Sequence, residues 1–239
     1  FLMSYLMFKF PLDLALWGAK FEFFQQDPFW GRMSEQLDLF AGSEKIAPKT
    51  PQRMSSGVRA LFFDLETQKS AHEVGGWENI HLMKLAVGVV WDSLEQQFFN
   101  YLEKDASQLA EKLRSADLVV GFNVIGFDYT VLQPYSDFDL QEIHTFDMLI
   151  DIKKKLGHRL SLDHLSQNTL KTQKSADGLV SLQWYREGKI DKIVEYCQKD
   201  VEITRDLFLY GESNGHVVYQ TRSGTTQNVE VDWKTANLI

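Results

Sequence analysis

The chain has 239 residues, a length that suits one compact domain together with a looser segment. Hydrophobic residues make up 44% of the chain and charged residues 24%, as in an average globular protein, which excludes disorder of the whole chain. The 25 basic and 33 acidic residues give a net charge of −8. This charge argues against a protein that holds nucleic acid mainly through a basic surface, but not against an enzyme that gathers carboxylates around metal ions.

The cysteine count and the apolar runs limit where the protein works. The chain contains a single cysteine, Cys197, which excludes an internal disulfide and a cysteine-based zinc site. One unpaired cysteine fits a reducing cytoplasm, which is the location that we expect. No apolar run reaches the ~18 residues of a transmembrane helix, so the sequence predicts a protein that does not span a membrane.

The first 57 residues differ in character from the rest, and we expect them to lie outside the folded domain. Residues 1–32 are crowded with Phe, Leu, Met and Trp but follow neither helical nor strand periodicity. A signal peptide is one interpretation, but its basic start is missing. Because the residues from Met33 onward look like an ordinary protein start, we favour an upstream extension, which need not belong to the native product. Residues 41–57 are small and polar, contain two prolines, and are typical of a linker.

From residue 58 onward the pattern becomes regular, and strands alternate with helices. The expected strands are 60–64, 84–91, 97–101, 117–121 and one near 142–146, and the expected helices are 107–115, 129–133, 160–165, 182–186 and 189–210. This order predicts an α/β layered domain with a mixed sheet flanked by helices, over residues 58–212. The remaining residues, 213–239, predict a small C-terminal hairpin around Ser223 and Gly224.

The first acidic motif is Asp64-Leu65-Glu66, at the end of the first expected strand. Because side chains alternate between the two faces of a strand, Asp64 and Glu66 point the same way and Leu65 points into the core. Two neighbouring carboxylates repel each other unless a cation lies between them. Taken alone, this common motif is better explained as a polar strand end in solvent.

Two further acidic motifs follow on later elements. Asp128 stands at the head of a helix, after a buried strand and a turn, where a carboxylate is also what an N-cap needs. Tyr196 and Asp200 are four residues apart on a late helix, so they share one face. A hydrogen-bonded pair that only packs explains them equally well. Neither motif decides the function by itself.

Together, the motifs form a specific order: Asp-x-Glu on a first strand, Asn-x-x-x-Phe-Asp after a later strand, and Tyr-x-x-x-Asp on a late helix. This order resembles the DEDD 3′–5′ exonucleases of the ribonuclease-H-like superfamily, in their tyrosine subclass. Over residues 59–209 the chain is similar to the exonuclease domains of family B DNA polymerases and to YprB-type ribonuclease-H-like proteins. The histidine subclass has a histidine where this chain has Glu195, so the sequence supports the tyrosine subclass.

The resemblance implies a metal-dependent 3′–5′ exonuclease that cuts phosphodiester bonds at single-stranded or frayed 3′ ends of nucleic acid and releases nucleoside monophosphates. Its two Mg²⁺ or Mn²⁺ ions would be held by four carboxylates: Asp64, Glu66, Asp128 and Asp200. Tyr196 would be the catalytic tyrosine that orients the attacking water. Hard divalent cations prefer oxygen ligands, and a pair of them activates water and stabilises the leaving oxygen. The ions also explain how an acidic site acts on an anionic backbone.

Residues beside the motifs are candidates for contact with nucleic acid. Leu65 and Thr67 flank the first motif, and Leu65 would wedge against the terminal base. Asn123 would contact the terminal nucleotide, although a turn also favours asparagine. Phe127 would stack on a base, although a core position is the commoner role of a phenylalanine. The basic run at 153–159 is equally compatible with a grip on the phosphate backbone and with a solvated helix face.

A separate motif precedes the linker. Residues 36–40, Gln-Leu-Asp-Leu-Phe, resemble the short peptide by which bacterial replication and repair proteins bind the sliding clamp. Gln36 would make an orienting hydrogen bond, and Leu39 and Phe40, with Leu37 in the same peptide, would supply the apolar contacts. The alternative is a chance amphipathic pentapeptide, because short motifs match easily.

Two other functions compete with the exonuclease. The first is a non-catalytic nucleic-acid-binding module, but such a module has no reason to retain four mutually repelling acids. The second is a structure-directed endonuclease on the same fold. The Tyr196–Asp200 motif favours the exonuclease, and analysis of the reaction products separates the two.

Overall fold

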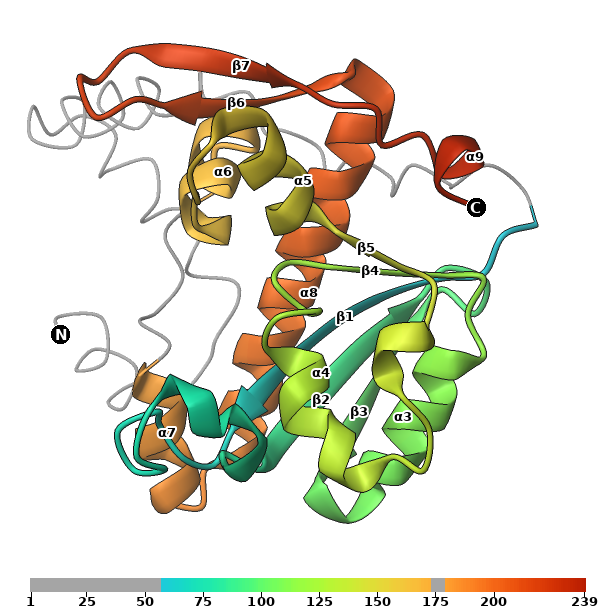
Figure 1. The fold of residues 1–239 in the computed structure, drawn as a ribbon, viewed down its shortest axis with the longest axis vertical. Coiled ribbons are helices and arrows are strands. Elements are labelled where there is room, and N and C mark those ends of the chain that lie inside the picture. Colours follow the sequence, from blue (N-terminus) through green and yellow to red (C-terminus); the bar gives the residue numbers. More distant parts are fainter. Residues whose placement is uncertain (1–56, 173–178) are drawn as a thin grey trace, which may run out of the picture. The chain divides into compact units, whose positions relative to one another are not determined.

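The structure is a computed structural model that describes residues 57–172 and 179–239 (Figure 1). The described residues belong to one compact unit of the chain. The expected extension at 1–32 and the expected clamp peptide at 36–40 lie outside the described residues. None of the helices in the described ranges is long and apolar enough to cross a membrane.

A mixed five-stranded sheet lies at the centre, in the order β3-β2-β1-β4-β5. Its strands are β1 (Ala60–Thr67), β2 (Leu85–Asp92), β3 (Gln97–Leu102), β4 (Leu118–Gly121) and β5 (Thr145–Asp147). β1 pairs antiparallel with β2 and parallel with β4, β2 pairs antiparallel with β3, and β4 pairs parallel with β5. The predicted mixed sheet flanked by helices is confirmed.

The central strand β1 is buried on both faces, because its apolar side chains point alternately to the two faces of the sheet. Ala60 and Phe62 join the core cluster that includes α8 (Ile190–Asn214), and Leu61 and Phe63 join the opposite cluster under α3 (Ala106–Arg114) and α4 (Asp128–Leu132). Figure 1 shows α8 on one face of the sheet and α3 and α4 on the other. Each fully buried leucine or phenylalanine side chain stabilises the fold by about 1.5–3 kcal/mol, so β1 holds its final residues firmly in place.

The remaining helices connect or cover the sheet. They are η2 (Trp77–Leu82), η3 (Glu103–Asp105), η4 (Gln133–Tyr135), η5 (Leu140–Glu142), α5 (Met148–Leu156), α6 (Leu162–Thr169), α7 (Leu179–Arg186) and α9 (Thr235–Leu238). Asp147 caps α5 by accepting hydrogen bonds from the second and third residues of the helix, and Gly157, with φ of 77°, ends it. Neither α5 nor η2 was among the expected helices, although the solvated helix face considered for the basic run at 153–159 overlaps the last turn of α5.

The predicted hairpin is present as β6 (His216–Gln220) and β7 (Thr226–Glu230), which pair antiparallel. The residues of this segment that point inward belong to the same core cluster as α8. Trp233 is 1% exposed, its ring stacks on Phe208 with centroids 6.1 Å apart, and its Nε1 donates to Asp151 Oδ2 at 2.8 Å. The end of the chain is therefore fastened to α5 and α8.

Candidate active site

Three carboxylates meet where the end of β1 lies beside α8. One carboxylate oxygen from each of Asp64, Glu66 and Asp200 lies within 4.8 Å of the other two. Strand alternation puts Asp64 and Glu66 on the face that Ala60 and Phe62 present to α8, as the sequence predicted. A single divalent cation is small enough to bind oxygens from all three side chains at this spacing.

Asp128 reaches the same strand end from the first turn of α4. Its side chain is 3% exposed, and its Oδ1 accepts a hydrogen bond of 3.1 Å from the backbone N–H of Leu65. Phe127 occupies the N-cap position of α4, and no side chain caps this helix. The alternative that Asp128 serves as an N-cap is therefore wrong: its carboxylate is directed to β1, between the two acids of the first motif.

Burial and nearby negative charges raise the pKa of all four acids. Burial raises the pKa of Asp64 well above its ordinary value, and the charges of the other three acids raise it further. Burial is also the main cause that raises the pKa of Asp128 to about 8 and that of Glu66 to about 7. The pKa of Asp200 rises to about 6 through burial and the negative charge of Asp163 on α6. Such a cluster binds protons or cations in preference to remaining fully ionised.

Neighbouring side chains hold individual acids in place. Ser181 on α7 donates a hydrogen bond of 2.6 Å from Oγ to Glu66 Oε2, which partly offsets the rise in the pKa of Glu66. The buried thiol of Cys197 lies 3.5 Å from Asp64 Oδ2 and 3.3 Å from the carbonyl oxygen of the same residue. Sequence reasoning missed both partners, because each lies more than 100 residues from the acid that it contacts.

Tyr196 lies one helical turn before Asp200 on α8, as expected. Its hydroxyl hydrogen-bonds the Asp200 carboxylate, which lowers the pKa of that acid against the effect of burial. The Tyr196 ring is half-buried and meets Trp184 of α7 edge to face, with centroids 6.2 Å apart. This contact fixes the ring, so the hydroxyl is held at the edge of the acid cluster.

The candidates for contact with nucleic acid differ in how far their side chains are exposed. Leu65 is 4% exposed within the core, and Thr67 is 9% exposed and donates from Oγ1 to the Lys69 carbonyl at 2.9 Å. A wedge role for Leu65 does not agree with this burial, because a core side chain does not reach a base. Its backbone N–H instead fixes Asp128.

Asn123 and Phe127 lie in the turn between β4 and α4. Asn123 has φ of 70°, a left-handed conformation that asparagine tolerates, and its Oδ1 accepts a hydrogen bond of 3.0 Å from Arg159 Nη2. Phe127 is half-buried, and its ring meets that of Trp77 edge to face. Both geometries agree with structural roles, and contact with a nucleotide stays a prediction.

The buried carboxylate of Asp147 organises this turn. It accepts hydrogen bonds from the backbone N–H groups of Asn123 at 2.9 Å and Ile125 at 3.1 Å, besides capping α5. One side chain therefore ties the turn after β4 to the end of β5 and the start of α5. The turn delivers Asp128 to the strand end in a fixed position.

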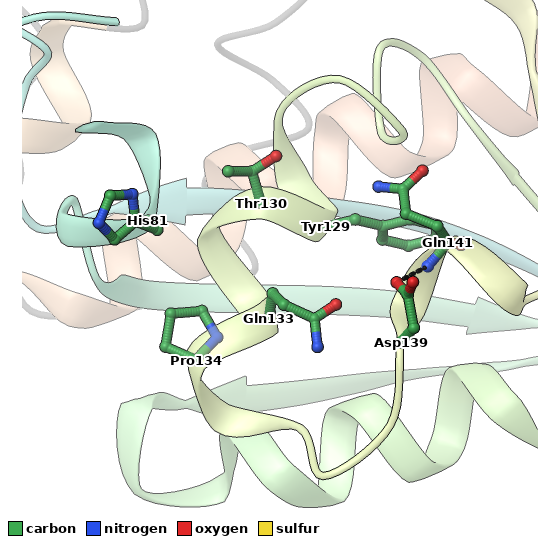
Figure 2. Close-up of a pocket in the computed structure, with 7 residues that line it drawn as sticks. All are labelled: His81, Tyr129, Thr130, Gln133, Pro134, Asp139 and Gln141. Carbon is green, nitrogen blue, oxygen red and sulfur yellow. Dashed lines mark hydrogen bonds between the residues drawn. The ribbon is translucent and has the colours of Figure 1, made fainter. Parts of the chain in front are cut away.

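A hollow of about 550 Å³ lies over α4 (Figure 2). Its lining residues are His81, Tyr129, Thr130, Gln133, Pro134, Asp139 and Gln141. Figure 2 shows that they come from η2, from α4 and from the segment that follows it. None of the four acids is among these residues, so the hollow is not where the chemistry of the cluster would take place.

Comparison with known proteins gives distant structural similarities. The chain is similar to the family B DNA polymerase from the hyperthermophilic archaeon Pyrobaculum calidifontis, with 16% identity, a TM-score of 0.46, and coverage of 66% of this chain and 26% of the polymerase. It is also similar to an apo structure of Exonuclease I, with 11% identity, a TM-score of 0.38, and coverage of 65% and 42%. The chain thus spans less than half the length of either protein.

In sequence, the chain matches no individual curated protein. Residues 61–210, well over half of the chain, match the RNase_H superfamily. The matched range begins in β1 and ends in α8, so it contains all three acidic motifs. The chain therefore belongs to the RNase_H superfamily.

Proposed function

We propose that the protein is a metal-dependent 3′–5′ exonuclease that hydrolyses the terminal phosphodiester bond of a single-stranded or frayed 3′ end and releases nucleoside monophosphates. The observation that carries the proposal is the approach of Asp64, Glu66 and Asp200, whose carboxylate oxygens lie within 4.8 Å of one another. Membership of the RNase_H superfamily supports a nuclease in general. The direction of cleavage and the tyrosine subclass rest on the order of the three motifs.

The donor set fits divalent cations. All four acids offer hard oxygen ligands, and their raised pKa values mean that the metal-free cluster retains protons that a cation would displace. Mg²⁺ or Mn²⁺ bound by these carboxylates would activate a water molecule and stabilise the departing 3′ oxygen. The described part of the chain offers no other group of three or more such ligands at this spacing.

The surrounding residues position the ligands and the water. Ser181 engages Oε2 of Glu66, which leaves Oε1 available to a cation. The Asp128 carboxylate is positioned by the N–H of Leu65, which donates to its Oδ1, and by its own backbone N–H. Tyr196 holds Asp200 by its hydroxyl and would orient the attacking water, a role that does not require the tyrosine to ionise.

The direction of cleavage is tested with single strands of DNA and of RNA labelled at either end. We expect 3′-labelled strands to release labelled mononucleotide from the first time points, and 5′-labelled strands to shorten one nucleotide at a time. Early internal fragments would indicate the endonuclease instead. Binding of strands without any cleavage would indicate a module that only binds nucleic acid.

Metal dependence is tested in the same assay. Cleavage should require Mg²⁺ or Mn²⁺ and stop in excess chelator, because the carboxylates alone neither activate water nor stabilise a leaving oxygen. Full hydrolysis in excess chelator would refute the role of the ions. Restoration of activity by added Mn²⁺ controls for damage by the chelator.

The proposal extends to one protein partner. Residues 36–40 would bind the bacterial sliding clamp, with Leu39 and Phe40 as the apolar anchors and Gln36 and Leu37 as supporting contacts. This part of the proposal rests on the sequence pattern alone. Binding would raise the local concentration of the nuclease at clamp-loaded ends.

A further inference from the structure

Trp77 is the most exposed of the large hydrophobic side chains in the described residues, at 69%. Single exposed apolar side chains are ordinary on a protein surface, so exposure alone says little. The Trp77 ring, however, meets the Phe127 ring edge to face, with centroids 6.4 Å apart and the planes at 61°. An edge contact of this kind leaves a flat face of the indole open to solvent.

The position of this aromatic pair is what distinguishes it. Phe127 directly precedes Asp128, and Asp128 accepts the hydrogen bond from Leu65 between the two acids of β1. The exposed indole therefore stands beside the element that delivers one of the four acids. Leu94 is also exposed but lies far from the acids along β1. It is in the turn between β2 and β3, where the N–H of Ser93 donates to the carbonyl of Ala60, at the opposite end of β1.

The segment that carries Trp77 is held firmly. The N–H of Gly76 donates to the Ala71 carbonyl at 2.8 Å, and Asn79 Nδ2 donates to the Val74 carbonyl at 2.9 Å. Glu73, in the same segment, forms an ion pair of 2.9 Å with Arg186 of α7, the helix that carries Ser181. In Figure 1 this teal segment lies beside α7 at the end of β1.

We propose that Trp77 stacks on a base of the substrate strand at or next to its 3′ end, an inference that rests on the proposed function. An indole face is a suitable platform because every base has a flat face, and stacking on aromatic side chains is tolerant of sequence. A protein with a net charge of −8 gains little affinity from a general attraction to phosphates, so contacts of this kind would supply much of the binding.

The test compares Trp77→Ala, Trp77→Phe and Leu94→Ala in the full chain. Stacking on one aromatic ring is worth enough that Trp77→Ala should weaken single-strand binding about 5- to 150-fold. Trp77→Phe should retain most of the binding, and Leu94→Ala should match the parent. Binding is measured by fluorescence anisotropy in an Asp200→Asn background, which prevents cleavage, and KM and kcat are measured in the active protein, where KM should change more.

Strands with one abasic position then locate the stacked base. Each strand lacks a single base, at the first to the fourth position from the 3′ end. The difference between the parent and Trp77→Ala should disappear for one of these positions only, because an abasic nucleotide has nothing to stack on the indole. A merely structural role of Trp77 would weaken binding equally for every strand.

The outcomes separate this inference from the proposed function. Equal binding by the parent and Trp77→Ala, equal losses with Trp77→Ala and Trp77→Phe, or no position dependence would each overturn the stacking role. A position-dependent loss of binding without any cleavage by the parent would support the contact with a base and refute the exonuclease. A parent that does not bind single strands would refute both.

Discussion

Asp128→Asn should stabilise the metal-free protein at alkaline pH. Burial raises the pKa of Asp128 from its ordinary 3.8 to about 8, so this acid opposes folding whenever it must ionise in the native state. Below pH ~4 the acid is protonated in both the folded and the unfolded chain, and replacement by the neutral amide changes little. Between pH ~4 and ~8 the unfolded chain loses the proton first, so the penalty grows with pH and is full above the folded pKa.

The size of the gain follows from the same values. The rise in pKa from 3.8 to about 8 corresponds to roughly 6 kcal/mol, at ~1.4 kcal/mol for each tenfold change in acidity. Neighbouring acids share the protons of the cluster, and the amide makes a weaker hydrogen bond with the Leu65 N–H, so we expect a net gain of about 2 kcal/mol. For a chain of this length, this raises the melting temperature by about 4–8 °C.

Thermal melting in chelator at pH 8.5, 7 and 5 measures the effect, which should shrink as the pH falls. Asp92→Asn is the matched control, because Asp92 is also fully buried but receives hydrogen bonds from Lys112 and Arg59, which lower its pKa to about 2 against the effect of burial. This control should destabilise the protein at pH 7 by about 1–3 kcal/mol, since Arg59 and Lys112 each lose a charged hydrogen-bond partner and keep only Glu95. If Asp128→Asn destabilised the metal-free protein at pH 8.5, the pKa of Asp128 would not be raised in the folded protein, and the reasoning would be wrong.

Three further predictions concern the partners of the acids and the clamp peptide. Tyr196→Phe should keep the fold and lower kcat about 10- to 150-fold, less than Asp64→Ala does, because metal binding survives and only the orientation of the water and the hydrogen bond to Asp200 are lost; full activity would exclude a role of the hydroxyl. Ser181→Ala should raise the Mg²⁺ concentration needed for half-maximal thermal stabilisation about 10- to 100-fold, and an unchanged titration would refute the positioning of Glu66. Leu39→Ala with Phe40→Ala should abolish binding of a peptide of residues 33–47 to purified sliding clamp, measured by fluorescence anisotropy. In the whole chain, the same two changes should leave cleavage of short oligonucleotides unchanged. If the unaltered peptide did not bind the clamp, the motif would be a chance match.

Elements with strong apolar periodicity were predictable from the sequence. The apolar run of β1 and the alternating Asp64 and Glu66 gave both the strand and the shared face of the two acids. Helix α5 was not predicted although Asp147 caps it and Gly157 ends it, because its last turn is basic and its buried apolar residues cover little more than the turn before it. The short turn η2 has no periodicity to detect, since its exposed Trp77 does not follow a core pattern.

The acids of the site were predictable, but their partners were not. Asp64, Glu66 and Asp200 come together because α8 packs along the face of β1 to which alternation assigns the first two. Sequence spacing says nothing of Ser181, whose hydrogen bond to Glu66 joins residues 115 positions apart. The sequence also allowed Asp128 to be a helix cap, and only its hydrogen bond with Leu65 assigns it to the strand end.

The hydrogen bonds around the site have a consequence for metal binding. Ser181 engages Oε2 of Glu66, so this carboxylate keeps Oε1 for a cation, whereas the Asp128 carboxylate accepts hydrogen bonds from the backbone N–H groups of Leu65 and of Asp128 itself. These bonds also lower the pKa of both acids against the effect of burial, which reduces the competition of protons with a metal ion. The carboxylates repel one another, but the buried strand that bears two of them keeps these two in place despite the repulsion. A cation that binds Asp64, Asp200 and Oε1 of Glu66 would remove much of this repulsion without disturbing the bonds that position the acids, so metal binding should stabilise a site that is already in place rather than fold it.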